Sequence, residues 1–172
     1  ISSLKACTVI GSIQKGQEVH GEIEKKGFHV KEIAVGNALV AMYAKLGLLC
    51  EAQCQFDHLL VRNIVTWNAL IAGYARCGSI NPARRCFIDM QIQGIKPNEL
   101  VFTNMMIACC HEGLAEEAIC YFKSMQGEHG IDASLEHYGC IVDLLGRTGA
   151  LKEACYVLQT MPMPPDIVVW RA

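Results

Sequence analysis

Basic side chains recur at a regular interval along the sequence. Lys45, Arg76, His111 and Arg147 are separated by 31, 35 and 36 residues. If these positions are equivalent in stacked units, their side chains line one edge of the stack and can bind successive phosphate groups of a nucleic acid. Each position also lies near the expected end of a helix, where a cation stabilises the helix dipole by ~0.3–1 kcal/mol. The two roles are compatible, and the pattern favours phosphate contact.

The overall composition excludes a strongly basic nucleic-acid module. The 172 residues carry a formal net charge of −2, and the pI is near 6.3. Any nucleic-acid binding must therefore depend on local basic positions. Hydrophobic residues make up 52% of the chain, enough for a large core, but no apolar run approaches the ~18 residues that span a bilayer. No membrane partner is expected.

The cysteines are numerous, but their spacing does not indicate a metal site. No CxxC pair is present, and Cys50 and Cys54, one helical turn apart, would supply only two ligands. Most of the ten lie among Ala, Leu and Ile in helical patterns, which favours reduced packing residues over disulfides or a metal. No metal or other cofactor is expected. The ten are Cys7, Cys50, Cys54, Cys77, Cys86, Cys109, Cys110, Cys120, Cys140 and Cys155.

The elements that must position these residues form an internal repeat. Segments 36–47, 67–78 and 138–149 align without gaps, and segment 102–113 fits the same frame. Each segment ends in glycine, which is typical of a helix C-terminus. Their starts differ by 31, 35 and 36 residues, and the chain up to Glu32 resembles the trailing part of a further unit.

Each unit has the pattern of two antiparallel helices. In the clearest unit, Thr66 is a plausible N-cap of the first helix, and Gly78 ends that helix. Asn81 is expected to cap the second helix with Pro82 at its first position, and Gly94 follows its end. No hairpin of this kind buries its apolar stripe alone, so the units must stack. The predicted fold is all-α, a right-handed superhelical α-solenoid.

The sequence resembles the pentatricopeptide repeat family. Residues 65–98, VTWNALIAGYARCGSINPARRCFIDMQIQGIKPN, resemble its standard unit, and residues 35–47, VGNALVAMYAKLG, resemble its short variant. Residues 4–28 and 102–125 resemble the long unit, and residues 137–166 resemble the short unit that closes such arrays. The tetratricopeptide signature is not met. The alternation of lengths resembles the plant PLS subclass, which works mainly in RNA editing.

The resemblance implies a division of the chain into units. These are a partial long unit 1–32, a short unit 33–63, a standard unit 64–98, a long unit 99–134 and a closing short unit 135–166. Residues 167–172 resemble the start of the C-terminal extension of that subclass. Both ends are expected to be cut from a longer chain, with any targeting peptide outside it, and the resemblance implies a mitochondrial or chloroplast protein.

In this family the fifth and the last residue of a unit together select one RNA base. For Asn–Asn pairs the family pattern favours pyrimidines, with cytosine ahead of uracil, so units 33–98 are expected to read two adjacent pyrimidines. Gly139 has no side chain with which to select a base. The second residues, Ala34, Val65 and Leu100, would sandwich the bases. The pairs are Asn37 with Asn63, Asn68 with Asn98, Thr103 with Ser134, and Gly139 with Asp166.

Other roles remain open for these residues. An asparagine near a helix start is commonly a cap or turn residue, whether or not it contacts RNA. The expected function is sequence-specific binding of single-stranded RNA. The specific role expected is recognition of C-to-U editing sites. The alternative is a scaffold that binds a partner protein or peptide, for which small organellar RNA-editing proteins are candidates.

One short motif suggests catalysis. Some members of the subclass end in a zinc deaminase-like domain, with an HxE motif followed by PCxxC. His20-Gly21-Glu22 matches HxE by letter, but no PCxxC is present, and the segment lies in an expected amphipathic helix. The match is interpreted as coincidence, and the chain is not expected to be an enzyme.

Overall fold

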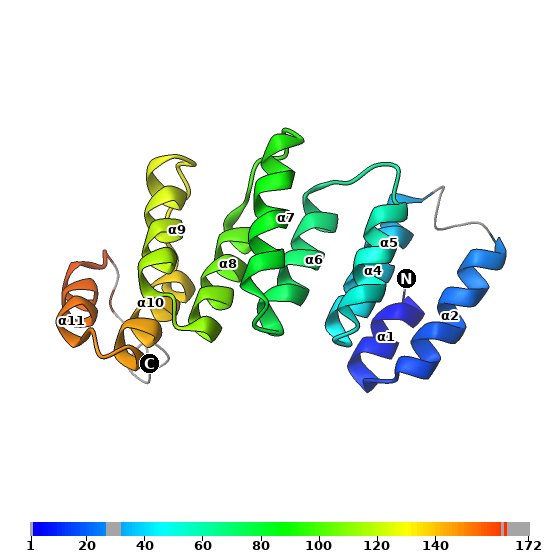
Figure 1. Cartoon of the computed structure of the whole chain (residues 1–172), viewed down its shortest axis with the longest axis horizontal. Coiled ribbons are helices and arrows are strands. Elements are labelled where there is room, and N and C mark those ends of the chain that lie inside the picture. The colour runs from blue at the N-terminus through cyan, green and yellow to red at the C-terminus, as the bar shows by residue number, and fades with distance from the viewer. Residues whose placement is uncertain (1, 27–31, 163, 165–172) are drawn as a thin grey trace.

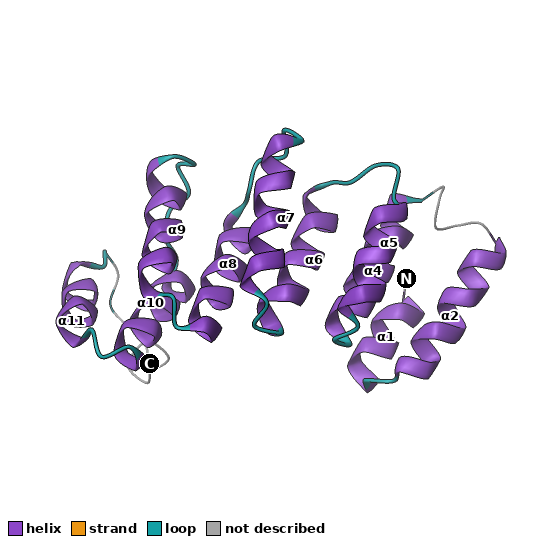
Figure 2. Ribbon diagram, in the orientation of Figure 1, coloured by secondary structure: helices purple, strands orange, loops and turns teal. Residues whose placement is uncertain are grey.

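The chain folds into consecutive helical hairpins. The computed structural model describes residues 2–26, 32–162 and 164, and these contain ten helices and no strand (Figure 2). The first hairpin is α1 (Ser2–Ile10) with α2 (Ile13–Lys26). The others are α4 (Ile33–Lys45) with α5 (Leu49–His58), α6 (Ile64–Arg76) with α7 (Ile80–Ile92), α8 (Glu99–Glu112) with α9 (Ala115–Gly127), and α10 (Leu135–Arg147) with α11 (Leu151–Thr160).

The hairpins stack in a single row that runs the length of the molecule (Figure 1). The first helices pack on one another in the order α1, α4, α6, α8, α10, and each of α5, α7 and α9 also packs on the first helix of the next hairpin. The first helices therefore form one continuous layer, and the second helices cover it from the other side. This arrangement confirms the predicted all-α solenoid.

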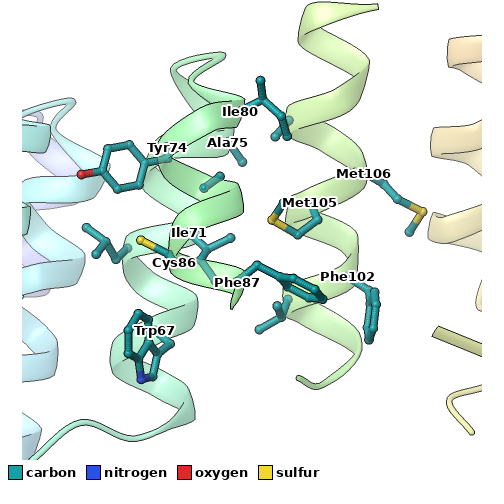
Figure 3. Packing of buried hydrophobic residues seen from close by; sticks show 14 of the residues in the cluster. Trp67, Ile71, Tyr74, Ala75, Ile80, Cys86, Phe87, Phe102, Met105 and Met106 are labelled. Atoms are coloured by element: carbon teal, nitrogen blue, oxygen red, sulfur yellow. The ribbon is translucent and has the colours of Figure 1, made fainter. Parts of the chain in front are cut away.

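The core is continuous across hairpin boundaries. Figure 3 shows side chains of α6, α7 and α8 meeting in one apolar cluster, in which Phe87 packs edge-to-face on Phe102 with ring centroids 5.6 Å apart. Phe56 of α5 and Trp67 of α6 form a similar pair at 4.6 Å. Each fully buried large side chain contributes roughly 1.5–3 kcal/mol of transfer free energy. Because these contacts join neighbouring units, each unit depends on the next for its stability.

Glycine allows the first helices to approach closely. A Cβ built on Gly73 of α6 would lie 2.7 Å from the Cβ of Ala44 on α4, closer than two carbons can pack. Gly78 has φ +66°, a left-handed conformation that ends α6, as expected from the sequence. Equivalent positive φ angles occur at Gly47, Gly113 and Gly149.

Two predicted helix starts are wrong. The N-cap of α6 is Asn63, whose side chain accepts from the backbone N–H groups of Val65 and Thr66, so Thr66 is the third helical residue instead. Ser79 precedes α7, so Pro82 is its third residue. Proline is tolerated there because the first four N–H groups of a helix have no partner within it. Both helices start earlier than their sequence signals indicate.

The packing role predicted for the cysteines holds for half of them. All ten are free thiols; Cys50, Cys54, Cys77, Cys120 and Cys155 are exposed. The exposed ones lie mainly on second helices, whose outer faces have no covering layer. Among the described residues no group of three or more His, Cys, Asp or Glu side chains could hold a metal ion, and no described helix is long and apolar enough to cross a membrane.

We expect the buried thiols to resist alkylation in the native protein. Burial raises the pKa of Cys86, Cys109 and Cys140 to about 12. Only about one such thiol in ten thousand is then ionised at pH 8, and the thiolate is the reactive form. Brief iodoacetamide treatment followed by peptide mass spectrometry should label Cys120 and spare Cys109 until denaturant is added. Equal labelling of these two residues would contradict the burial of Cys109.

Candidate nucleic-acid interface

The first candidate base-reading pair is a connected polar network. The Asn37 amide Nδ2 donates to Oδ1 of Asn63 at 3.2 Å. The Thr66 hydroxyl lies between them: it donates to Oδ1 of Asn37 and accepts from the backbone N–H of Asn63 at 3.1 Å. Asn37 and Thr66 are buried, and Asn63 is half-buried. The fifth and last residues of unit 33–63 are thus brought together, at the junction of α4 and α6.

The helix cap determines which atoms of this pair remain available. Oδ1 of Asn63 accepts from the backbone N–H groups of Val65 and Thr66 at 3.0 and 3.1 Å. Because backbone N–H groups only donate, the oxygen must face the helix, and Nδ2 of Asn63 points the other way. Asn37 must then direct its own Nδ2 at the Asn63 oxygen and its Oδ1 at Thr66. The pair therefore presents amide N–H donors at its edge.

The second pair is held differently. Oδ1 of Asn98 accepts from the backbone N–H of Val101 at 3.1 Å, so Asn98 is the N-cap of α8. Asn68 instead accepts from Nδ2 of Asn104 at 2.9 Å. Asn104 is the sixth residue of the next unit and is not one of the site residues predicted from the sequence. Its only sequence signal is that it is a polar residue beside Thr103.

In unit 99–134 a histidine connects the pair. Nε2 of His137 lies 3.0 Å from the Thr103 hydroxyl, and Nδ1 lies 3.0 Å from the backbone nitrogen of Ser134. Since that nitrogen donates, Nδ1 accepts and Nε2 carries the proton. Thr103 is 4% exposed and donates its own proton to the carbonyl of Glu99. It therefore has little capacity left for a base.

The closing unit, residues 135–166, has fewer side chains that could select a base. Gly139 lies in α10 and has no side chain to contribute. Asp166, its expected partner, lies outside the described residues.

The expected sandwiching residues lie on the surface. Val65 and Leu100 are 56% and 54% exposed, although most apolar side chains of the first helices are buried. Ala34 is also exposed. An exposed aliphatic residue at the same position of three units provides a row of apolar surfaces against which base faces can pack.

The basic positions lie on the same helix face, farther along. Lys45 follows Ala34 by 11 residues, which is three helical turns and about 16 Å. Lys45 and His111 are exposed. Arg76 and Arg147 are exposed too, but each bonds the preceding unit: Arg76 donates to the carbonyl of Ala44 at 2.7 Å, and Arg147 to that of Cys110 at 3.0 Å. Arg147 also pairs with Asp143 at 2.9 Å.

The arginines thus have a structural role in addition to the two expected from the sequence, which are phosphate contact and stabilisation of the helix dipole. Each caps the end of the preceding first helix across the unit boundary. The remaining N–H groups of a guanidinium, which has five donors, are enough to bind a phosphate as well.

The HxE segment lies at a packing contact. His20 of α2 bonds the Tyr43 hydroxyl of α4 through Nδ1 at 2.8 Å, and Nε2 lies 3.4 Å from Glu24. Burial is the largest cause that raises the pKa of Tyr43. His20 therefore joins two hairpins, a role that accounts for its presence without catalysis.

A groove of about 630 Å³ lies between α9, α10 and α11. Its walls are largely apolar and carry lysines near the rim. The lining residues include Ile119, Phe122, Lys123, Ile141, Lys152 and Tyr156.

Comparison with known proteins agrees with this architecture. The PPR repeat family model matches residues 62–111, and a PPR repeat model matches residues 100–129. Two pentatricopeptide repeat-containing proteins of Arabidopsis thaliana are 39% and 42% identical over 100% and 98% of the chain, which covers 26% and 36% of their own lengths. The chain therefore spans about a quarter to a third of these relatives.

A solved structure is similar as well. The maize pentatricopeptide repeat protein PPR10, crystallised with an 18-nucleotide psaJ RNA element, has a TM-score of 0.77 at 19% identity. The match covers 97% of this chain and 25% of PPR10. The helix-pair stack, the repeat matches and the relatives agree, and the chain belongs to the pentatricopeptide repeat family.

Proposed function

We propose that the chain is a sequence-specific module for single-stranded RNA. The observation that carries the proposal is the contact between Asn37 and Asn63, which brings the fifth and last residues of one unit together at a helix junction. Two further features support it: the exposed side chains of Val65 and Leu100, and the cationic positions on the same helix face. These positions, Lys45, Arg76, His111 and Arg147, are called the basic column below. The RNA bound by PPR10, a protein of the same fold, is consistent with it.

The surface suits RNA in three ways. Amide and hydroxyl groups can hydrogen-bond the edge of an unstacked base, one pair per nucleotide. Aliphatic side chains between successive pairs can pack on base faces, and cations about 16 Å along each helix can contact the backbone. With unit 99–134 poorly equipped and unit 135–166 lacking a fifth side chain, selectivity should come mainly from units 33–63 and 64–98.

The finer function that we propose is recognition of C-to-U editing sites in a plant mitochondrion or chloroplast. It is supported by the steps of 31, 35 and 36 residues, which resemble the alternating units of the PLS subclass. The unit boundaries 1–32, 33–63, 64–98, 99–134 and 135–166, with an extension starting at 167, belong to this proposal. Helices α4, α6, α8 and α10 begin at the first residue of each complete unit. Any deaminase-like activity would reside in another part of the protein.

Binding should be tested on nucleic acids of matched length. Fluorescence anisotropy with a 12-nucleotide pyrimidine RNA, the matching DNA and an RNA duplex should show tightest binding to the single-stranded RNA. The logarithm of affinity should fall linearly with the logarithm of salt concentration, with a slope of about −0.7 per phosphate contacted. Absence of RNA binding at low salt would reject the proposal.

We predict different effects for two substitutions in the basic column. Lys45→Ala should weaken binding to all RNA sequences alike and reduce the salt slope by about one contact. Its effect on stability should be limited to the helix-dipole interaction, ~0.3–1 kcal/mol. Arg76→Ala should weaken binding in the same way and also destabilise the protein by about 1 kcal/mol, because it removes the bond to Ala44. Arg85→Ala, on the exposed surface of α7, is the control and should leave the salt slope unchanged. A Lys45→Ala variant with full affinity would remove the column from the RNA path.

A protein-binding scaffold is the second candidate, and the groove at α9, α10 and α11 favours it. A small organellar RNA-editing protein that offers an amphipathic helix is the partner class we would place there. Tyr156→Glu, at a 67% exposed position of the groove, should abolish such binding and leave RNA affinity unchanged. Loss of RNA affinity instead would assign Tyr156 to the RNA surface.

A further inference from the structure

The third residue of a unit contacts the base-reading pair of the unit before it. Thr66 is the third residue of unit 64–98 and bonds both Asn37 and Asn63. His137 is the third residue of unit 135–166 and lies between Thr103 and Ser134. Both are 0% exposed, so neither can contact RNA itself. Two unrelated side chains thus occupy the same position and make the same kind of connection.

Where the third residue is apolar, the connection is absent. Val101 is the third residue of unit 99–134 and contributes only its backbone N–H, to Asn98. The fifth residue of the preceding unit, Asn68, bonds Asn104 instead. A polar third residue is therefore found where the fifth and last residues of the preceding unit are connected by hydrogen bonds.

We propose that Thr66 is a positioning residue that sets base choice in unit 33–63 by orienting the Asn37 amide, an inference that rests on the proposed RNA-binding function. The Thr66 hydroxyl accepts from the Asn63 N–H, and its own proton has two acceptors in reach, of which Oδ1 of Asn37 at 2.5 Å is closer than Oδ1 of Asn63 at 3.1 Å. Oδ1 of Asn37 receives that proton, and Nδ2 faces Asn63 and the edge of the pair. The amide cannot rotate by 180° without placing its oxygen against the Asn63 oxygen and losing its bond from the Thr66 hydroxyl.

This orientation has a consequence for the base. Both asparagines present N–H donors, which match the N3 and O2 acceptors of cytosine. Uracil carries a proton on N3, so the N3–H donor of the base would face an N–H donor of the asparagine pair. The fixed amide therefore favours cytosine over uracil, and a freely rotating amide would accept both.

Thr66→Val removes the hydroxyl and keeps the shape of the side chain. One oriented hydrogen bond changes an equilibrium by about fivefold, so the cytosine-to-uracil preference at this nucleotide should fall by about that factor. Selection from RNA with randomised positions, followed by sequencing, reports the preference at each nucleotide. Anisotropy on RNAs that differ only in that base gives the ratio of affinities.

Two further variants separate positioning from stability. Thr66→Ser retains the hydroxyl and should restore the preference. Thr160→Val makes the same chemical change at an exposed helix end and should leave it unchanged. Melting temperatures are measured for all variants. If Thr66→Val keeps the wild-type ratio, or if Thr66→Ser fails to restore it, Thr66 does not position the pair. If the wild-type protein binds no RNA, the proposed function itself fails.

Discussion

Changing Asn68 to Thr together with Asn98 to Asp is expected to shift the base preferred by unit 64–98 from a pyrimidine toward guanine. The Asn98 side chain offers amide donors beyond its cap bond to Val101. Aspartate offers only acceptors, which match the N1–H and N2–H donors of guanine. A change of this kind is worth roughly 1–3 kcal/mol, about fivefold to 150-fold in affinity ratio.

The fold should tolerate this change. Aspartate is as good an N-cap as asparagine, so α8 keeps its first bond to Val101. Threonine at position 68 is half-buried and retains a hydroxyl that can bond Asn104. The melting temperature should therefore change little, and the binding data can be interpreted as base choice.

The recoded protein needs a control for its added negative charge. Asn81→Asp makes the same substitution in α7, where Asn81 is exposed and bonds Arg84. It should lower affinity slightly for all RNAs and keep the pyrimidine preference. Binding is measured on RNAs with each of the four bases at the nucleotide concerned. If the doubly substituted protein still prefers a pyrimidine, the pairing of Asn68 with Asn98 is the wrong register.

Most of the fold could be predicted because each unit repeats the same local signals. Apolar spacing of about 3.6 residues and a glycine after each first helix are sufficient for the hairpins and their order. The start of α6 could not be predicted from Thr66 alone, because Asn63 and Thr66 are both acceptable N-cap residues. The tertiary contact of Thr66 with Asn37 selects Asn63 as the cap.

Less of the candidate site could be predicted, because its organisation lies between units. The pair Asn37–Asn63 could be placed from the repeat frame, but the bonds from Thr66 and His137 cross a unit boundary and cannot be recognised within one unit. The same is true of Arg76, whose bond to Ala44 depends on how closely α6 approaches α4. A comparison of third positions, Val35, Thr66, Val101 and His137, would have indicated that two of the four are polar inside an apolar layer.

His137→Ala is expected to destabilise the C-terminal hairpin by about 3 kcal/mol. The ring is 0% exposed, so its removal leaves a cavity between α8 and α10. It also leaves the Ser134 backbone N–H without its acceptor, and an unsatisfied buried polar group costs ~1–3 kcal/mol. The Thr103 hydroxyl loses its contact with His137 but keeps its bond to the Glu99 carbonyl. His111→Ala, at an exposed position of α8, is the matched control and should stay within about 0.5 kcal/mol of the wild type.

The location of this loss is as informative as its size. Because each unit contacts only its neighbours, hydrogen exchange in His137→Ala should accelerate in α10 and α11, while α4 and α6 keep their protection. His137→Phe fills most of the cavity and lacks the two nitrogen contacts, so it should recover about half of the lost stability. The difference between the two variants measures the polar connection between units separately from packing. Acceleration spread evenly over all hairpins would mean that the stack unfolds as one unit, and that His137 does not act at a boundary.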